Sequence, residues 1–218
     1  VDDGNDATNK MQIRAAVESC PLAVLVERQK NGGKGKAMTS GVLKAHELGL
    51  THVFQIDSDA QHDASRAPFF IEAAEENPSC LICGTPVFDE SVPTSRKKGR
   101  EISNRWARFV SLSDEIVDAM CGFRIYPVAP YCRLLTHRAW VDARMGYDAD
   151  ILVHFVWSGV HIKSYPVRVT YPADGISNFR MVRDNIRISL SFTKLFFGMI
   201  VRLPLLAFRA ICRRRAHG

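Results

Sequence analysis

Two carboxylates stand one residue apart in the stretch HVFQIDSDAQHD, residues 52–63, where an apolar run ends. Asp57 and Asp59, with Gln61 close behind, offer oxygen atoms of the kind that Mg²⁺ or Mn²⁺ prefers. An EF-hand loop is excluded, because the sixth and twelfth positions lack the Gly and Glu that it needs. A solvated turn and a catalytic acid–base pair stay open, although adjacent positions at a strand end favour chelation over action on opposite sides of a bond.

A glycine-rich segment, NGGKGKA at residues 31–37, is the second candidate for chemistry. It is not a P-loop, because its Gly-Lys steps lack both the upstream Gly and the following Ser or Thr. The dinucleotide pattern GxGxxG fails because position 38 is Met. The lysines of the segment could still meet phosphate, so on its own it indicates an anionic ligand only weakly.

A CxxC motif, CLIC at residues 80–83, is the third. No second cysteine pair follows at zinc-ribbon spacing, and the Leu-Ile between the two thiols is typical of a buried strand. A metal or redox site is therefore not favoured here. Thiols in apolar runs indicate a reducing compartment.

The elements that must position these residues follow an α/β pattern in the first part of the chain. A β-rich run at residues 22–28, the glycine-rich loop, a helical pattern ending at Gly49 and a strand at 51–56 make one βαβ unit, which predicts a parallel sheet. A helix at 67–77, ended by Asn-Pro, and a buried strand at 79–88 continue the alternation.

The middle of the chain predicts further elements of both kinds. Residues 89–104 are polar and basic, which indicates a loop or mobile segment. The spacing then predicts a helix at 101–113, a short strand or turn at 118–127, a helix at 147–159 that stops at Gly159, and a strand at 160–171. Proline inside this last strand places it at a sheet edge.

The amino-acid composition changes from residue 185 onward, where a strongly apolar stretch is interrupted by cationic residues. On a helix these cations fall within about one 100° arc, opposite a set of apolar side chains. The cations are Lys194, Arg202, Arg209 and Arg213, and the apolar set is Phe196, Met199 and Leu203. Pro204 should kink the helix. No run reaches the ~18 apolar residues of a membrane span, so the pattern favours an amphipathic helix lying in a lipid interface, with a core-packing helix as the alternative.

Composition bounds the class of protein. The chain has 218 residues, of which 46% are hydrophobic and 24% charged, which suits one globular domain. The net charge of +6 predicts an anionic partner: nucleic acid, a phosphorylated substrate or a membrane surface. Nucleic acid is not favoured, because the basic residues lack interleaved aromatic residues on a strand platform.

Four segments in a fixed order carry a resemblance to a known family. VDDGNDAT, GKGKAMTSG, HVFQIDSDAQHD and CGFRIYP resemble the VDDGSxDxT, GKGxA, DADxQH and SGFRxY patterns of the family 2 glycosyltransferases. The likeness covers roughly residues 1–180 and is nearest to the branch of dolichyl- and polyprenyl-phosphate sugar synthases. It implies an α/β, GT-A (Rossmann-like) fold, a mostly parallel sheet flanked by helices, over residues 1–184, with residues 185–218 as an amphipathic basic tail. The apolar strand with which the family opens is absent, so we expect a truncated chain.

The resemblance implies a donor site for a nucleotide-diphosphate sugar. Asp2 and Asp3 match the acidic pair that contacts the base and ribose. Lys34 falls in the loop near the nucleotide. Arg124 matches a basic residue near phosphate, and Arg100 matches another more loosely.

The same resemblance implies the metal ligands and a catalytic carboxylate. Asp57 and Asp59 match the DxD pair that holds Mg²⁺ or Mn²⁺, and Gln61 matches an added ligand. In the segment where an acidic residue faces the acceptor, Asp150 is the first choice and Asp148 the second. Asp57 is therefore expected to bind both the metal ion and the nucleotide sugar.

The expected function is that of an inverting, metal-dependent glycosyltransferase with a lipid-linked or polyprenyl-phosphate acceptor. A hydroxyl acceptor would need a carboxylate as base, whereas a polyprenyl phosphate would need cations such as Arg100 or Arg124. DGISNFRMVRDNIRIS at 174–189 resembles bacterial members, and arginines near the end could each contribute about 1 kcal/mol beside an anionic leaflet. We therefore expect a peripheral cytoplasmic protein on the inner face of the cell membrane.

Three other functions stay open at this point. A soluble glycosyltransferase acting on a polysaccharide or protein hydroxyl would have its C-terminal helix packed on the core. A non-catalytic scaffold of the same fold would bind neither nucleotide nor metal. A nucleotidyltransferase also uses acidic metal sites, but the chain has no matching glycine-rich signature.

Overall fold

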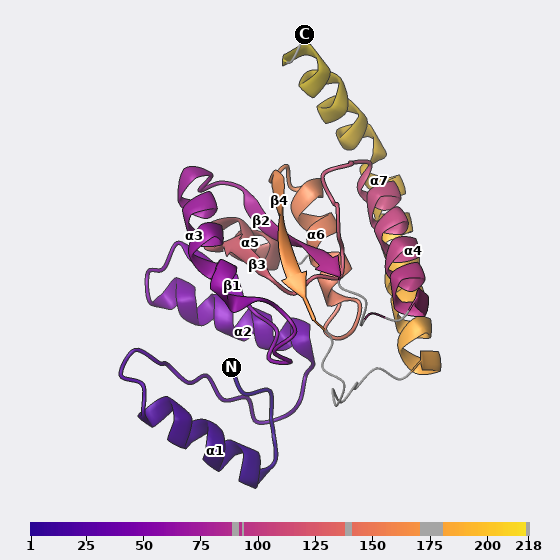
Figure 1. Cartoon of the computed structure of the whole chain (residues 1–218). Coiled ribbons are helices and arrows are strands. Elements are labelled where there is room, and N and C mark those ends of the chain that lie inside the picture. The colour runs from indigo at the N-terminus through magenta and orange to yellow at the C-terminus, as the bar shows by residue number, and fades with distance from the viewer. Residues whose placement is uncertain (89–91, 93, 138–140, 171–180, 217–218) are drawn as a thin grey trace.

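The computed structural model describes residues 1–88, 92, 94–137, 141–170 and 181–216 (Figure 1). Its four-stranded sheet has the order β1-β3-β2-β4, with β1 at His52–Gln55, β2 at Leu81–Phe88, β3 at Arg124–Pro127 and β4 at Ile162–Val169. β2 and β4 pair in parallel along all of their length, whereas β3 runs antiparallel to both of its neighbours. The expectation of a mostly parallel sheet is therefore wrong: the sheet is mixed.

The expected βαβ unit does not form, and this explains part of the difference. Leu22 and Val24 are 94% and 57% exposed, and only Glu27 of this run makes a β-bridge, to Asp2. An apolar run becomes a strand where neighbours pair with it along its length and cover it, and the run at 22–28 has only this single bridge at one end. The edge position expected for the proline-containing strand is confirmed, because β4 is the last strand of the sheet.

Helices alternate with the strands along the described part of the chain. They are α1 (Ala7–Glu18), α2 (Lys34–Glu47), the 3-10 turn η1 (Ala64–Arg66), α3 (Ala67–Glu76), α4 (Thr94–Ser111), α5 (Val128–Thr136), α6 (Tyr147–Trp157) and α7 (Met181–Ala216). Gly49 and Gly159 follow α2 and α6 with φ of 74° and 86°. Both stops were predicted, because glycine adopts this left-handed conformation without a Cβ penalty.

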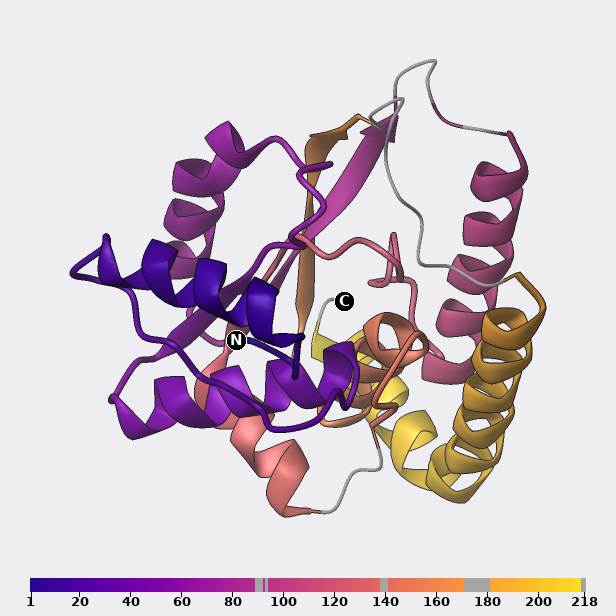
Figure 2. The ribbon, with the colours of Figure 1, turned by 90° about the horizontal axis from the view of Figure 1, so that it is seen from below.

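Two cores lie on opposite faces of the sheet. Phe70 of α3 packs with Phe123 and Val167 in the smaller cluster. The larger cluster joins side chains of α2, α5 and α6 to the other face, for example Val42, Tyr131 and Phe155. α4 and α7 lie side by side beyond α6, as both views show (Figures 1 and 2).

The polar segment at 89–104 differs from its prediction. Apart from residues 89–91 and 93, which lie outside the described part, most of it belongs to α4, which begins at Thr94. α4 is amphipathic: Ala107 and Val110 are buried, while Glu101 and Arg105 pair at 3.0 Å on its exposed side. The polar composition of this segment wrongly indicated a loop, because the polar residues form the exposed face of an amphipathic helix.

α7 is a helix, as expected, but its surface is not divided as expected. Phe192, Leu195 and Met199 are buried in the larger core, and the boundary expected at 184/185 lies inside the helix. Apolar side chains also cover much of its outer side, so the helix is apolar rather than amphipathic. The last, yellow part of α7 runs in a different direction from the first, in keeping with the kink expected at Pro204 (Figures 1 and 2).

Candidate functional site

The acidic turn follows directly after β1. Gln55, the last residue of the strand, donates from Nε2 to Asp57 Oδ1 at 3.1 Å. Asp59 is exposed and accepts from the backbone N–H of Gln61 at 3.2 Å. Ala60 between them has φ of 55°, a left-handed conformation that is uncommon for a residue with a side chain. Such strain gathers at functional sites, because the surrounding structure must hold it in place.

A glycine makes room for the Asp57 carboxylate. A Cβ added at Gly122, in the loop before β3, would overlap both carboxylate oxygens and Cγ of Asp57. The glycine of the CGFRIYP segment is therefore required by the aspartate of the DSDAQH segment. Asp57 and Gly122 are 65 positions apart in the sequence (122 − 57), yet their segments are in direct contact.

Lys34 joins this turn to α6. Its Nζ lies 2.8 Å from Oδ1 and 3.0 Å from Oδ2 of Asp57, and 2.7 Å from Oδ2 of Asp148. Burial disfavours the charged ammonium, but Asp148 and Asp57 outweigh it and raise the pKa of Lys34. Burial likewise opposes the charge on Asp57, yet the Lys34 ammonium lowers the pKa of this carboxyl. Lys34 and Asp57 therefore both carry their charge at neutral pH.

Arg124 is buried in the protein interior next to Asp148 and is not open to a ligand. Its side chain is fully buried and donates to the backbone oxygens of Asp148, at 2.7 Å, and Ala119, at 3.0 Å. It also donates to Tyr126 Oη at 3.3 Å and lies 3.7 Å from the Asp148 carboxylate. The expected contact with phosphate does not fit this burial. We interpret Arg124 as the group that holds Asp148 in position.

The acidic pair at the N-terminus has divided roles. Asp3 accepts from the backbone N–H groups of Gly32 and Gly33, at 3.0 and 2.7 Å, and from Arg28 Nε at 2.7 Å, so it shapes the glycine-rich loop. Asp2 is buried and accepts from Asn5, but its Oδ2 has no hydrogen-bond partner within the described residues. A buried acceptor without a donor is costly, and an N–H or O–H group of a ligand would satisfy it.

Arg100 and Asp150 do not join the Lys34 cluster. Arg100 donates to Asp118 Oδ1 at 2.6 Å, and its guanidinium lies 5.2 Å from the Phe88 ring centroid. Asp150 is buried, accepts from the Asp142 N–H and lines a cavity of about 560 Å³ between α6 and α7. Burial raises the pKa of Asp150 to about 7. Residues two apart on a helix point about 200° apart, so Asp148 faces the site and Asp150 does not.

The residues at the turn fit a hard divalent cation in donor type. Within the described residues no group of three or more His, Cys, Asp or Glu could hold a metal ion. However, Asp57 and Asp148 already converge on one cation, the Lys34 ammonium, and Asp59 and Gln61 add oxygen atoms on the same turn. An all-oxygen set of this kind suits Mg²⁺ or Mn²⁺.

The CxxC segment offers no such site. Cys83 is buried, and burial raises the pKa of its thiol to about 12. A thiol that stays protonated is a poor metal ligand and a poor nucleophile.

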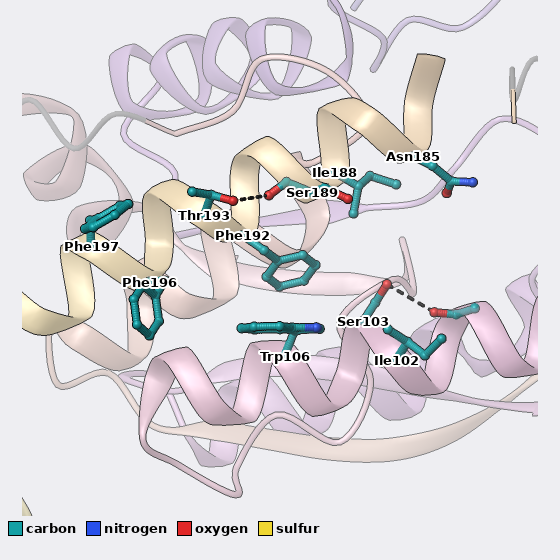
Figure 3. A pocket seen from close by; sticks show the side chains of 11 residues that line it. Ile102, Ser103, Trp106, Asn185, Ile188, Ser189, Phe192, Thr193, Phe196 and Phe197 are labelled. Atoms are coloured by element: carbon teal, nitrogen blue, oxygen red, sulfur yellow. Dashed lines mark hydrogen bonds between the residues drawn. The ribbon is translucent and has the colours of Figure 1, made fainter. Parts of the chain in front are cut away.

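An apolar groove lies between α4 and α7 (Figure 3). It has a volume of about 650 Å³, and in the close view Trp106 of α4 and Phe192 of α7 point toward one another, with ring centroids 6.3 Å apart. The exposed apolar side chains of the two helices, with Leu112 just after α4, form what we call the α4–α7 face: Ile102, Trp106, Phe109 and Leu112 with Ile186, Leu190, Phe197, Ile200, Val201, Leu203, Leu205 and Phe208.

Sequence reasoning missed the α4 half of this face, although the spacing of Ile102, Trp106 and Phe109 was a helical signal. The 25-residue stretch Asn185–Arg209 of α7 contains an 18-residue window with a mean hydropathy of 1.5, so the stretch is long and apolar enough to cross a membrane by length and composition. This differs from the expectation that no run reaches that length. Core helices pass the same test, so the finding is weak evidence for a membrane.

Comparison with known proteins gives two findings. The family model of glycosyl transferase family 2 matches residues 1–135. An uncharacterized protein of Methanocaldococcus jannaschii is 28% identical over 136 residues. That alignment covers 57% of this chain and 57% of the relative, so the chain matches little more than half of the relative's length.

Proposed function

Because the chain belongs to glycosyl transferase family 2, we propose that it transfers a sugar from a nucleotide-diphosphate sugar to an acceptor, with Mg²⁺ or Mn²⁺ at the acidic turn. One observation carries the proposal. The carboxylates of Asp57 and Asp148, from segments far apart in the sequence, each lie within 3.0 Å of the Lys34 ammonium. The scaffold reading does not require such a cluster of charges.

The donor side of the site is built from the first two segments. Asp2 would accept a hydrogen bond from the nucleotide at its buried Oδ2, which lies 4.0 Å from Lys10 Nζ but has no hydrogen-bond partner within the described residues. Asp3 fixes the glycine-rich loop from which Lys34 reaches the diphosphate. Asp57 would hold the divalent cation together with Asp59 and Gln61. When bound, the cation supplies positive charge against the negative charge that develops on the leaving diphosphate.

Asp148 is the better candidate for the acceptor side. Its carboxylate faces Lys34 and Asp57, and Arg124 holds it from below. With a hydroxyl acceptor, Asp148 Oδ2 would take the proton as the oxygen attacks the sugar carbon. A polyprenyl phosphate is already an anion, so with this acceptor Asp148 would not need to remove a proton. We expect inversion at the sugar carbon, as the family resemblance implies.

The α4–α7 face supports an acceptor that is lipid-linked or a polyprenyl phosphate. Large exposed apolar patches mark surfaces that meet another phase or partner, and Phe197, Val201 and Phe208 of α7 are all well exposed. We therefore propose a peripheral position on the anionic inner surface of the cell membrane. A soluble enzyme acting on a polysaccharide or protein hydroxyl remains the second candidate, favoured by the burial of Phe192 and Leu195 in the core.

Calorimetry tests the reaction class. UDP and GDP are titrated, each with Mn²⁺, into the protein and into the Asp57→Ala/Asp59→Ala variant. We expect metal-dependent binding of one nucleotide and its loss in the variant. A Glu72→Ala/Glu75→Ala variant, which removes two exposed carboxylates of α3, is the control and should bind as the wild type does. No binding of either nucleotide to the folded wild type would contradict the enzyme and favour a scaffold.

A further inference from the structure

We propose that Lys34 is a built-in competitor of the divalent cation, so that the cation binds Asp57 tightly only together with the diphosphate of the donor. The inference rests on the function proposed above and deepens it. It concerns the order and coupling of binding, not the identity of the metal ligands.

The contacts of Asp57 leave little room for two cations. Both of its oxygens lie within 3.0 Å of Lys34 Nζ, and Oδ1 also accepts from Gln55. The backbone of Gly122 closes another side of the carboxylate, since even a Cβ would overlap it there. A divalent cation that uses the Asp57 oxygens must therefore displace the ammonium.

The charge of the buried cluster gives the same result. The two carboxylates, Asp57 and Asp148, are matched by two cations, Lys34 and Arg124. A divalent cation alone would add two positive charges beside groups that are already balanced, because Asp59 is exposed and mostly solvated. Like charges in a partly buried site repel one another strongly. A diphosphate brings the negative charge that restores the balance.

Lys34 can leave Asp57 without leaving the site. It is the first residue of α2 and keeps a second contact, at 2.7 Å, with Asp148. An ammonium has three donors on a flexible stem and pairs readily with phosphate oxygens. The first turn of α2 also favours an anion, because its N–H groups carry the positive end of the helix dipole. The diphosphate thus draws Lys34 away as the cation takes its place.

The consequence is positive coupling between nucleotide and metal. Each should strengthen the binding of the other by the same factor, as linkage requires, and couplings of this kind are typically about 5- to 150-fold. Removing the charge of Lys34 should strengthen Mn²⁺ binding in the absence of nucleotide. It should also weaken the coupling, because the diphosphate then has no competitor to draw away.

The test is a binding cycle for Mn²⁺ and the nucleotide that binds in the calorimetric experiment. Free Mn²⁺ is measured by electron paramagnetic resonance, with correction for the Mn²⁺–nucleotide complex in solution. For Lys34→Met we expect Mn²⁺ alone to bind about tenfold more tightly than to the wild type, and the coupling to fall at least about fivefold. The control is Lys36→Met, which removes an exposed lysine two positions further on in α2 and should leave both quantities unchanged.

A second variant guards against loss of the fold. Lys34→Gln keeps a hydrogen-bond donor for Asp148 but carries no charge, and it should tighten Mn²⁺ binding in the same way. Unchanged or weaker binding of Mn²⁺ to folded Lys34→Gln would overturn the inference while leaving the proposed function intact. If no nucleotide binds to the wild type, the proposed function fails, but tighter binding of Mn²⁺ to the variants would still show the competition.

Discussion

The glycine at position 122 gives the sharpest test of how the site is built. Gly122→Ala adds one methyl group, and that group would overlap the Asp57 carboxylate. The φ of Gly122 is not among the positive values of the chain, so alanine is allowed by the backbone itself. The carboxylate must therefore move, giving up its contacts with Lys34 and its hydrogen bond from Gln55.

The magnitude follows from these contacts. Hydrogen bonds to charged groups contribute about 1.5–3 kcal/mol each. The Asp57 side chain is 27% exposed, so water recovers part of the loss, and we expect the free energy of unfolding to fall by about 2 kcal/mol. For a domain of this size that lowers Tm by roughly 4–8 °C. Metal-dependent nucleotide binding should weaken far more, because the carboxylate no longer lies at the turn.

Gly99→Ala is the matched control. It is the same chemical change inside α4, where an added Cβ meets nothing within 4 Å. Replacing glycine by alanine in a helix stabilises it by about 0.5–1 kcal/mol, so Tm should rise slightly and nucleotide binding should not change. Thermal unfolding followed by circular dichroism, with calorimetry for binding, measures both. A Gly122→Ala protein that binds metal and nucleotide like the wild type would refute the reasoning.

Three further predictions concern the carboxylates of α6 and the apolar face. Asp148→Asn should lower the initial rate of transfer to a hydroxyl acceptor about 100-fold or more, whereas Asp150→Asn should change it less than about tenfold; the reverse ranking would restore Asp150 as the base. Because burial raises the pKa of Asp150 from 3.8 to about 7, its folded form keeps a proton that the unfolded chain releases, and wild-type stability falls as pH rises through this window. Urea unfolding should therefore show Asp150→Asn gaining stability over the wild type at about pH 8 relative to about pH 4.5, and an equal difference at both would contradict the assignment. Phe197→Asp/Val201→Asp should leave Tm almost unchanged, since both side chains are exposed, yet abolish co-sedimentation with vesicles of anionic lipid; retained binding would place the membrane contact elsewhere.

Local signals in the sequence predicted most elements and their ends. Gly49 and Gly159 ended helices, proline placed β4 at the edge, and the acidic turn fell directly after a strand, as expected. These features depend on residues that are close together in the sequence, so the sequence pattern predicts them. The antiparallel insertion of β3 and the exposure of Leu22 and Val24 depend on which edges are available in the folded chain, and periodicity does not record that.

The candidate site likewise combines features that the sequence predicted with others that depend on the folded structure. Family patterns named Lys34, Asp57 and Asp148, which the structure brings together, but ranked Asp150 first. Only the direction of each side chain on α6 separates the two aspartates. Arg124 was expected to lie near phosphate because it matches a basic residue of the family pattern, but the structure buries it against Asp148. A motif gives the identity of a residue, while its role depends on the side toward which the backbone turns it.

The position of β3 in the sheet also bears on how the chain folds during synthesis. β1 and β2 leave the ribosome first, but they are not neighbours; residues 124–127 must enter between them before either has its inner partner. Until then both strands expose unpaired edges, and β2 waits for β4, some 80 residues later, to cover its other side. Pairings over such distances form slowly and leave intermediates prone to aggregation. Nascent chains that end before β3 should therefore depend on chaperones, and the sheet should become protected from hydrogen exchange only when β3 has entered.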